Sequence, residues 1–304
     1  METVSPNYKS GFVAVLGRPN VGKSTLINSL LGTKIAAVSP WPQTTRRRQM
    51  GILTAPDAQI ILIDTPGLHR PLHKLGEHMN AEVAAVLDEC DVALFMVDVS
   101  QLPTPDDQQL AALLDRSKRP IPRILVLNKV DLTEAAVLEV NRAAYQALLP
   151  EVDYFLISAT RGDNLEPLLS AMIARLPEGL PFFPTDQLTD LQERQIAADL
   201  IREAALLHLR AEVPHSIAVR IDEYTERKEE GAYIAATLFV ERESQKGIII
   251  GQGGTMLKKI GMAARKEVES LSGRKIYLSL RVKVRKNWRD DEEALRAFGF
   301  GDNR

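Results

Sequence analysis

The sequence contains a single cysteine, few aromatic residues and no long apolar run. Because Cys90 stands alone among 304 residues, an internal disulfide is excluded and a reducing compartment is favoured. No apolar run approaches the roughly 18 residues needed to cross a bilayer, and residues 1–10 lack the apolar stretch of a signal peptide. We therefore expect a soluble protein of the cytoplasm.

The overall charge excludes little, because 38 basic and 40 acidic side chains nearly cancel to a net charge of -2. Charges that cancel over the whole chain can still be segregated along it, and basic residues do gather near the C-terminus. A length of 304 residues favours two domains, since single cores commonly stop growing at roughly 250 to 300 residues.

Five short apolar runs are separated by stretches long enough to hold helices, at residues 12–16, 60–63, 92–97, 124–127 and 154–157. This alternation predicts an α/β fold with a doubly wound, mostly parallel sheet, because strands covered on both faces are apolar throughout. Residues 48–54 are more mixed in polarity, and we expect them to form an edge strand.

A change of pattern then divides the chain. Pro177, Pro181 and Pro184 lie in one short segment, a composition that neither continues a helix nor joins a central strand. After it, a helix, two strands, two further helices and a strand predict a smaller α+β domain. The predicted divisions are a tail at 1–10, the first domain at 11–176, a linker at 177–190, the second domain at 191–289 and a tail at 290–304.

The segment after the first apolar run has the form G-x-x-x-x-G-K-[ST] and precedes a helix-like stretch. Its residues are Gly17, Arg18, Pro19, Asn20, Val21, Gly22, Lys23 and Ser24. Glycines let the backbone N–H groups approach phosphate oxygens closely, Lys23 would lie against the β- and γ-phosphates, and Ser24 would bind Mg²⁺. The pattern predicts a site for a nucleoside triphosphate.

A second element follows the run at 60–63, with the residues Asp64, Thr65, Pro66 and Gly67. Asp64 can hold Mg²⁺ through a water molecule, and the Gly67 N–H can reach the γ-phosphate. By itself a D-x-x-G sequence is a weak signal and favours a surface turn after a strand.

The run at 124–127 leads into a base-recognition element, formed by Asn128, Lys129, Val130 and Asp131. The Asp131 carboxylate can accept hydrogen bonds from N1 and N2 of guanine, which adenine cannot donate. Asn128 would contact the base and neighbouring loops, and the Lys129 stem would cover the face of the base. Ser158 and Ala159, after the last run, could supply a backbone N–H to the guanine oxygen.

Together these elements resemble those of a translation-factor-type GTPase, with residues 42–46 as a switch loop. Thr45 is our candidate for a second Mg²⁺ ligand, although Thr44 is adjacent and equally polar. Lys23, Thr45 and Gly67 are accordingly the predicted catalytic set.

Leu68 occupies the position where many related GTPases place a water-orienting glutamine. Because an isobutyl group cannot hydrogen-bond, we expect slow intrinsic hydrolysis. GTPases with a hydrophobic residue here and an asparagine in the phosphate loop are associated with K⁺ dependence, so Asn20 is a candidate K⁺ ligand. The alternative is that Asn20 only tolerates an unusual backbone angle.

In the second domain, a G-x-x-G sequence follows an isoleucine run and precedes an amphipathic helix. A loop of this kind can clamp a sugar-phosphate backbone, and basic residues after it can neutralise phosphates. The predicted RNA-binding residues are Ile248, Ile249, Ile250, Gly251, Gln252, Gly253, Gly254, Lys258, Lys259, Arg265, Lys283 and Arg285. An anionic membrane could also attract the basic surface.

The order of elements in this domain is similar to that of a type II KH domain, and the whole arrangement resembles the Era family of bacterial ribosome-assembly GTPases. The resemblance implies a GTP-hydrolysing switch with Mg²⁺, binding to the 3′ end of small-subunit ribosomal RNA, and a role in maturation of the 30S subunit. It also implies peripheral contact with the inner membrane. The alternatives are a membrane-associated regulatory GTPase and an RNA-binding module with a structural nucleotide.

Overall fold

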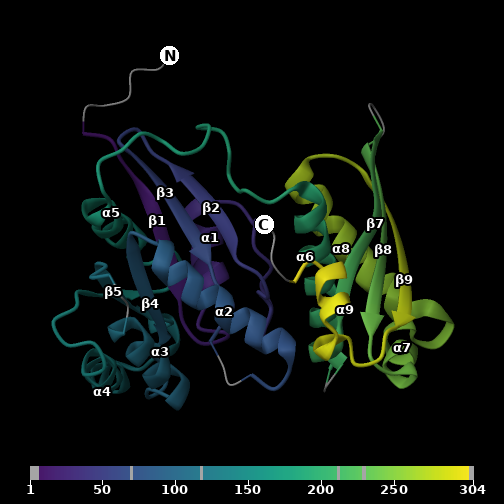
Figure 1. Ribbon diagram of the computed structural model, residues 1–304, viewed down its shortest axis with the longest axis horizontal. Coiled ribbons are helices and arrows are strands. Elements are labelled where there is room, and N and C mark those ends of the chain that lie inside the picture. The colour runs from purple at the N-terminus through teal and green to yellow at the C-terminus, as the bar shows by residue number, and fades with distance from the viewer. Residues whose placement is uncertain (1–6, 69–70, 117–118, 211–212, 228–230, 301–304) are drawn as a thin grey trace. The chain divides into compact units, whose positions relative to one another are not determined.

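The computed structural model describes residues 7–68, 71–116, 119–210, 213–227 and 231–300, which belong to two compact units (Figure 1). The first unit comprises residues 1–34, 45–70 and 79–190, and the second comprises 35–44, 71–78 and 191–304. The second unit therefore includes two segments from the N-terminal half of the chain, which the sequence patterns do not indicate.

The first unit is built on a sheet whose strands have apolar centres, which are buried in every strand except β6. Its strands are β1 (Lys9–Leu16), β2 (Gln49–Thr54), β3 (Ala58–Asp64), β4 (Val92–Asp98), β5 (Arg123–Asn128) and β6 (Tyr154–Ile157). They are ordered β2-β3-β1-β4-β5-β6, and only the edge strand β2 is antiparallel to its neighbour. The predicted doubly wound, mostly parallel sheet is confirmed.

Helices cover both faces of this sheet (Figure 1). They are α1 (Lys23–Leu31), α2 (Lys74–Glu89), α3 (Pro105–Asp115), α4 (Ala135–Gln146) and α5 (Leu165–Arg175), with a 3₁₀ turn η1 (Val130–Leu132). Val83, Leu110 and Tyr145 bring α2, α3 and α4 into one apolar cluster with β1, β4 and β5. Cys90 is buried in the same cluster, so this residue packs the core.

Residues 177–190, expected as a linker, are hydrogen-bonded along the first unit. The Pro177 carbonyl accepts from the Ser10 N–H at 3.1 Å, and the buried Gln59 side chain binds the backbone of Phe182 and Phe183. Farther along, the Ile52 N–H donates to the Leu188 carbonyl at 2.8 Å. The segment is thus an extension of the first unit and not a free tether.

The second unit has a sheet of β7 (Ala218–Arg227), β8 (Gly231–Val240) and β9 (Ile276–Val284), with β8 central. β7 is antiparallel and β9 parallel to β8. The helices are α6 (Glu193–His208), α7 (Glu243–Ile250), α8 (Thr255–Ser272) and α9 (Glu292–Ala297), with 3₁₀ turns η2 (Val213–Ser216), η3 (Gln252–Gly254) and η4 (Trp288–Asp290). Apolar residues of α6 and α8 pack against one face of the sheet. The order of elements is that of the predicted α+β domain.

Residues from 290 onward, expected as a tail, are instead folded through residue 300. Trp288 is completely buried and its indole N–H donates to the Ser216 carbonyl at 2.8 Å. Phe298 packs between Trp288 and Phe239, with ring centroids 5.3 and 4.7 Å away. Burial of these rings explains why the chain remains ordered here, and why Trp288 has a structural role.

Candidate functional site

The phosphate loop connects β1 to α1 and is closed by tight backbone contacts. Gly22 has φ of 107°, and a Cβ atom there would lie 2.5 Å from Nδ2 of Asn128. Only glycine combines this left-handed backbone with so close a neighbour. The loop therefore places its backbone beside the base-recognition element, at the carboxyl ends of β1 and β5.

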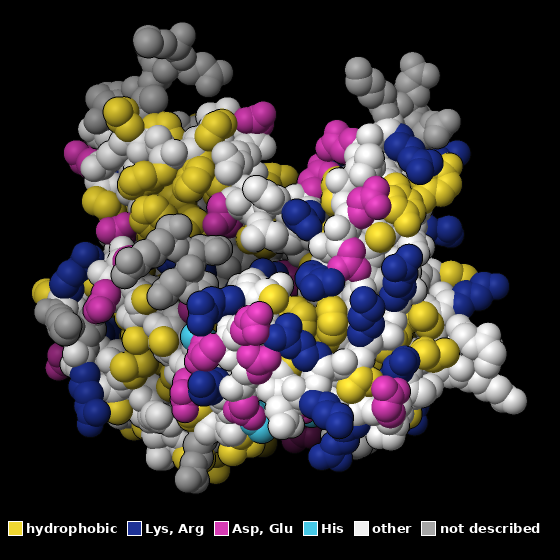
Figure 2. Space-filling view, turned by 45° about the vertical axis from the view of Figure 1, so that its right-hand side comes forward, with side chains coloured by type: hydrophobic (Ala, Val, Ile, Leu, Met, Phe, Trp, Pro, Cys, Tyr) yellow, Lys and Arg dark blue, Asp and Glu magenta, His cyan; other side chains and the backbone are white. Residues whose placement is uncertain are grey.

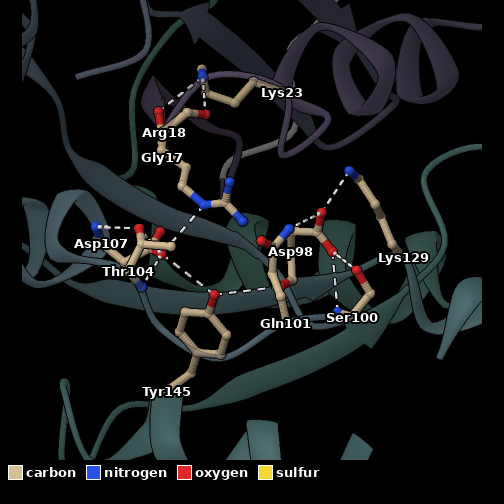
Figure 3. Close-up of polar contacts among 10 residues, drawn as sticks. All are labelled: Gly17, Arg18, Lys23, Asp98, Ser100, Gln101, Thr104, Asp107, Lys129 and Tyr145. Carbon is tan, nitrogen blue, oxygen red and sulfur yellow. Dashed lines mark hydrogen bonds and ion pairs between the residues drawn. The ribbon is translucent and has the colours of Figure 1, made fainter. Parts of the chain in front are cut away.

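The Lys23 ammonium lies within this loop. It is 6% exposed, and Nζ donates to the carbonyls of Gly17 and Arg18 at 2.9 and 3.1 Å (Figure 3). Burial lowers the pKa of Lys23 to about 8, although the Asp64 charge opposes this shift. A phosphate group bound in the loop would stabilise the buried ammonium, because a buried cation requires an anionic partner.

The Arg18 side chain points away from the loop, as Figure 3 shows. Its Nε lies 3.3 Å from the fully buried Asp107, which also binds Thr104 at the start of α3. The guanidinium is thus engaged with α3, and Arg18 can serve the phosphate site only through its backbone.

Ser24, Thr45 and Asp64 converge on one point. The Ser24 hydroxyl donates to the Asp64 carboxylate at 2.6 Å, the Thr45 hydroxyl does so at 3.1 Å, and the two hydroxyls are 3.0 Å apart. The other carboxylate oxygen of Asp64 is buried and has no hydrogen-bond partner within the described residues. Two hydroxyls and a carboxylate beside the phosphate loop form an oxygen set that fits Mg²⁺.

The neighbouring Thr44 does not share this position. Its hydroxyl lies 2.7 Å from that of Ser39 and donates to the Trp41 carbonyl at 2.8 Å. Spacing alone left Thr44 and Thr45 equivalent, whereas the geometry brings only the Thr45 hydroxyl to Ser24 and Asp64.

The D-x-x-G element approaches the phosphate loop closely. A Cβ atom on Gly67 would lie 2.5 Å from the backbone nitrogen of Pro19, so no side chain fits between the two loops. Thr65 is buried and donates to the Val15 carbonyl at 2.7 Å, which makes its side chain structural. Leu68 is 6% exposed and belongs to the apolar core, so its side chain cannot orient water.

Asn128 ties the base-recognition element to both neighbouring loops. Its Nδ2 donates to the Val21 carbonyl at 2.7 Å, and its Oδ1 accepts from the Ala159 N–H at 2.9 Å. Val130 follows in η1 and packs against the core. Ser158 is fully buried and its N–H donates to the Asp163 carbonyl at 3.3 Å, so this N–H and that of Ala159 are both engaged within the protein. Asn128 thus brings the phosphate loop, β5 and the loop after β6 together, as the motif spacing predicts.

Lys129 is oriented by Asp98, a residue that sequence reasoning missed. Asp98 accepts from Lys129 Nζ at 2.7 Å and from the Ser100 and Gln101 side chains (Figure 3). Burial opposes ionisation of Asp98, but these hydrogen bonds keep the pKa of its carboxyl below the ordinary value. Its position just after the apolar run at 92–97 was the available signal.

Asp131 lies beside Arg161, and Asn20 has a left-handed backbone conformation. The Asp131 side chain is 13% exposed, and its carboxylate lies 3.9 Å from Nε of Arg161. Asn20 has φ of 64°, which agrees with the alternative that an unusual backbone angle is tolerated there.

The glycine loop of the second unit connects α7 to α8. Gly253 and Gly254 adopt φ of 59° and 79°, and added Cβ atoms there would meet nothing within 4 Å. Gln252 is exposed and Gly251 partly so. The loop is therefore an open turn at the start of α8, where backbone N–H groups and the helix dipole favour an anion.

The isoleucine run before this loop is the end of helix α7. Ile249 is fully buried in the core, so its side chain is unavailable to a base, contrary to our expectation. Ile248 is 49% exposed and Ile250 partly so. Successive residues of a helix point in different directions, so the three isoleucines do not form one apolar surface as we expected.

The predicted basic residues lie on two different surfaces. Lys258, Lys259 and Arg265 are exposed on α8, after the glycine loop. Lys283 is exposed on β9, whose alternate residues Val282 and Val284 pack toward the helices, so its side chain lies on the other face of the sheet. Arg285 is engaged with Asp291 at 2.8 Å. The structure therefore does not unite Lys283 and Arg285 with the α8 cations.

An exposed aromatic ring, that of Tyr277, lies near basic residues, whereas the sequence offered no obvious ring for stacking on bases. Tyr277 is 50% exposed, and the Arg227 guanidinium lies 5.7 Å from the ring centroids of both Tyr233 and Tyr277. An open hollow of about 730 Å³ beside them is also lined by Arg265 and Lys275. On the right-hand side of Figure 2, Lys and Arg side chains lie among hydrophobic ones on the second unit.

No helix within the described ranges combines the length and hydropathy needed to cross a bilayer. The described part of the chain also lacks any group of three His, Cys, Asp or Glu residues that could hold a metal ion. The Mg²⁺-type oxygen set described above has a single carboxylate and so is compatible with that finding.

The phosphate loop, the D-x-x-G loop and the N-K-x-D element on a parallel sheet define a GTPase, and the second unit is a KH domain. Comparison with protein-family models agrees. Residues 12–129 match the model described as a 50S ribosome-binding GTPase, and residues 212–289 match the KH domain model.

Curated relatives are similar over nearly the whole chain. GTPase Era of Heliobacterium modesticaldum is 45% identical, with 97% of this chain and 98% of the relative covered, and GTPase Era of Geobacter metallireducens is 46% identical, with 96% and 98% covered. A crystal structure of Era with MgGDPNP and nucleotides 1506–1542 of 16S ribosomal RNA has a TM-score of 0.92 and 41% identity, covering 97% of this chain and all of that one. A point variant of Aquifex aeolicus Era bound to GDP·AlF₄⁻ has a TM-score of 0.91 at the same identity and coverage. The chain belongs to the Era family of GTPases.

Proposed function

We propose that this protein is a GTP-hydrolysing switch that binds the 3′ end of small-subunit ribosomal RNA and assists maturation of the 30S subunit. The observation that carries the proposal is the full-length similarity to an Era structure that holds both MgGDPNP and a segment of 16S ribosomal RNA. The motifs that support guanine-nucleotide binding lie in one unit, and the open glycine loop and basic residues that support RNA binding lie in the other. Each half of the proposed function therefore has its own site.

In the nucleotide site, Ser24, Thr45 and Asp64 are the residues that would hold Mg²⁺. When bound, Mg²⁺ would neutralise charge on the β- and γ-phosphates. Lys23 would contact the same phosphates, and the Gly67 N–H would face the γ-phosphate from the D-x-x-G loop. Lys23, Thr45 and Gly67 are thus the residues proposed to act on the reacting group, while Asp131 selects guanine.

Leu68 leaves the attacking water without a side chain to orient it, so we expect slow hydrolysis that K⁺ accelerates through the amide oxygen of Asn20. Replacing K⁺ by Na⁺ at constant ionic strength should lower phosphate release by about 10-fold, a factor worth roughly 1.4 kcal/mol of barrier. Asn20→Gly retains a backbone compatible with φ of 64° but removes the amide, so it should abolish the difference between the two cations. A cation response that survives in Asn20→Gly would refute this role.

In the KH domain, the glycine loop would contact the RNA backbone, with Lys258, Lys259 and Arg265 neutralising phosphates. Ile248 and Ile250, which are at least partly exposed, are the isoleucines that could contact bases. Peripheral contact with an anionic membrane is a further property that exposed basic residues could support. Cosedimentation with vesicles containing anionic lipid would test it separately.

Fluorescence anisotropy with an oligonucleotide of the 16S 3′ end tests the proposed RNA target. We expect binding to exceed that of a scrambled oligonucleotide of equal length, and Lys258→Glu with Lys259→Glu should weaken it while GDP affinity stays within about 2-fold. Arg116→Glu, which reverses an exposed charge at the end of α3, is the control. Equal affinity for both oligonucleotides would argue against the ribosomal target.

A further inference from the structure

The sheet of the second unit has one face covered by helices and one face that is partly open. Apolar side chains such as Ile234 on β8 and Leu278 on β9 pack with α6 and α8 (Figure 1). Because side chains alternate along a strand, the residues between them lie on the other face. Phe298 covers one end of that face, where its ring centroid lies 4.7 Å from that of Phe239. At the other end Tyr277 is 50% exposed, so this end is open.

The register of the sheet places two tyrosines side by side on the open face. Tyr233 on β8 is paired directly with Tyr277 on β9, and the Arg227 guanidinium lies 5.7 Å from both ring centroids. Both rings line the open hollow of about 730 Å³, which leaves space for a further group beside them. Nucleic-acid bases stack on aromatic rings and on guanidinium planes, and this cluster offers both.

The next positions along the open face carry small side chains. Ala235 and Ser279 are paired across β8 and β9, immediately beyond the tyrosines on the same face. These side chains are much shorter than the rings, so they form a shallow recess beside Tyr277. The following pair on this face brings in the first cation, Arg281.

Exposed cations continue the open face along β9. Arg281 and Lys283 are both exposed, at about 13 and 20 Å from Tyr277 for a rise of roughly 3.3 Å per residue. Asp222 and Glu223, the acidic residues of this face, hydrogen-bond with neighbouring side chains of β7 and β8. In the part of the chain that the structure describes, neither Arg281 nor Lys283 forms an ion pair. Their charge is therefore available to an anionic partner.

Rings and cations on one open sheet face favour single-stranded RNA as the occupant. Stacked bases can use the rings while the cations neutralise phosphates, and the sheets of other RNA-binding domains hold two or three bases in this way. The shallow recess beside Tyr277 suits a planar base. A lipid headgroup surface would be attracted by the same cations but would not require such a recess.

We propose that this sheet face, defined by Arg227, Tyr233, Tyr277, Arg281 and Lys283, is a second RNA-binding surface of the KH domain. It binds a single-stranded segment with a base against Tyr277 and phosphates against Arg281 and Lys283. This assignment rests on the RNA-binding half of the proposed function. The surface is distinct from the glycine loop, which lies between α7 and α8.

Fluorescence anisotropy of full-length variants with single-stranded RNA of about 16 nucleotides tests the surface. The 16S 3′-end sequence and its scrambled counterpart are both used, because stacking on an aromatic ring tolerates any base. Tyr277→Ala should weaken binding of both RNAs by about 10-fold, whereas Tyr277→Phe keeps the ring and should stay within about 2-fold of wild type. Tyr154→Ala is the matched control and should resemble wild type, because it removes another exposed ring with a guanidinium near it, that of Arg142 at 5.3 Å.

Two further variants separate stacking and charge from any loss of folding in Tyr277→Ala. Lys283→Glu alters an exposed side chain, and it should weaken RNA binding and make the slope of log affinity against log salt shallower by about 0.7. In Tyr277→Trp the fluorescence of the introduced indole, measured as the difference from wild type, should be quenched by RNA.

RNA affinities within about 2-fold of wild type in both Tyr277→Ala and Lys283→Glu would overturn the proposal. So would reduced cosedimentation of these variants with anionic vesicles at unchanged RNA affinity, which would make the face a membrane surface. If Tyr277→Ala shows no cooperative thermal unfolding, an unquenched Tyr277→Trp together with unchanged binding in Lys283→Glu overturns it. Wild-type protein that binds neither RNA would instead refute the RNA-binding half of the proposed function.

Discussion

Asp131 is the residue on which guanine selectivity depends in the proposed site. Its carboxylate can accept two hydrogen bonds from guanine, and charge-assisted bonds of this kind contribute about 1.5 to 3 kcal/mol each. In Asp131→Asn the amide presents one acceptor and one donor, so GDP affinity should fall by about 100-fold. The same amide matches the xanthine edge better, because xanthine carries a carbonyl in place of the guanine amino group.

Equilibrium binding of GDP and XDP to wild type and Asp131→Asn would measure this exchange. The variant should prefer XDP, and Asp163→Asn, which alters another acidic residue of the nearby loop after β6, should keep the preference for GDP. Retention of tight GDP binding in Asp131→Asn would show that another group reads the base.

Lys23 should make nucleotide binding depend on pH. Burial lowers the pKa of Lys23 to about 8, so the nucleotide-free protein loses this proton as the pH rises through 8. Phosphate oxygens favour the charged ammonium, so binding must restore the proton. We expect GDP binding to take up about 0.5 proton at pH 8, about 0.9 at pH 9 and almost none at pH 6 through this group.

Calorimetry in two buffers with different protonation enthalpies measures that uptake. EDTA should be present, so that Mg²⁺ does not change the charge at Asp64, which lies close to Lys23. The observed enthalpy should depend on the buffer at pH 8 and 9. A buffer-independent enthalpy at both values would mean that Lys23 keeps its proton in the free protein.

At the scale of secondary-structure elements, Asn128 is the point where three loops are joined. It is 3% exposed, and its amide binds both the Val21 carbonyl and the Ala159 N–H. Asn128→Ala would leave two buried backbone groups unpaired, at about 1 to 3 kcal/mol each. We expect the free energy of unfolding to fall by about 2 to 6 kcal/mol and GDP affinity to fall as well.

Urea unfolding with and without GDP would test this coupling between elements. Asn141→Ala is a suitable control, because its amide donates to the Val99 carbonyl, away from the phosphate loop. It should destabilise the protein while leaving the stabilisation by GDP nearly unchanged. If Asn128→Ala retained the full stabilisation by GDP, Asn128 would be only a structural residue.

Local sequence patterns were sufficient to predict the sheet and the motifs at the carboxyl ends of its strands. Parallel strands require continuous apolar runs, and a motif such as the one from Gly17 to Ser24 is contiguous, so both can be recognised without knowing any distant contact. The bond of Asp98 to Lys129 and the pairing of Tyr233 with Tyr277 could not be found in this way. Each joins residues more than 30 positions apart, and the choice of such a partner is made by tertiary packing.

The same limit explains where the expected domain divisions and the RNA-binding residues differ from the structure. Nothing in the composition of residues 35–44 or 71–78 indicates that they belong with the KH domain. Ile249 was grouped with its neighbours because the sequence of an apolar run does not show which of its side chains face the core. In helix α7 the side chain of Ile249 faces the core. Lys283 was grouped by charge with α8, but the alternation of β9 sends it to the other sheet face.

For the whole molecule, RNA binding should depend on the local clustering of basic residues more than on the net charge of -2. If Lys258 and Lys259 each neutralise one RNA phosphate, their replacement by Glu should make the slope of log affinity against log salt concentration shallower by about 1.4. Anisotropy titrations between 50 and 300 mM KCl would measure the slope. An unchanged slope would place the phosphate contacts elsewhere, with the separate basic surface of β9 the first alternative.

The chain passes between the two units after residues 34, 44, 70, 78 and 190. Cutting the chain after residue 190 would separate an N-terminal from a C-terminal fragment. The C-terminal fragment would then lack residues 35–44 and 71–78, which belong to the second unit. Arg202, Asp290 and Glu292 would then lose the groups they bind. Recombination at a single point should therefore rarely exchange one domain without the other, and related proteins should inherit both domains together.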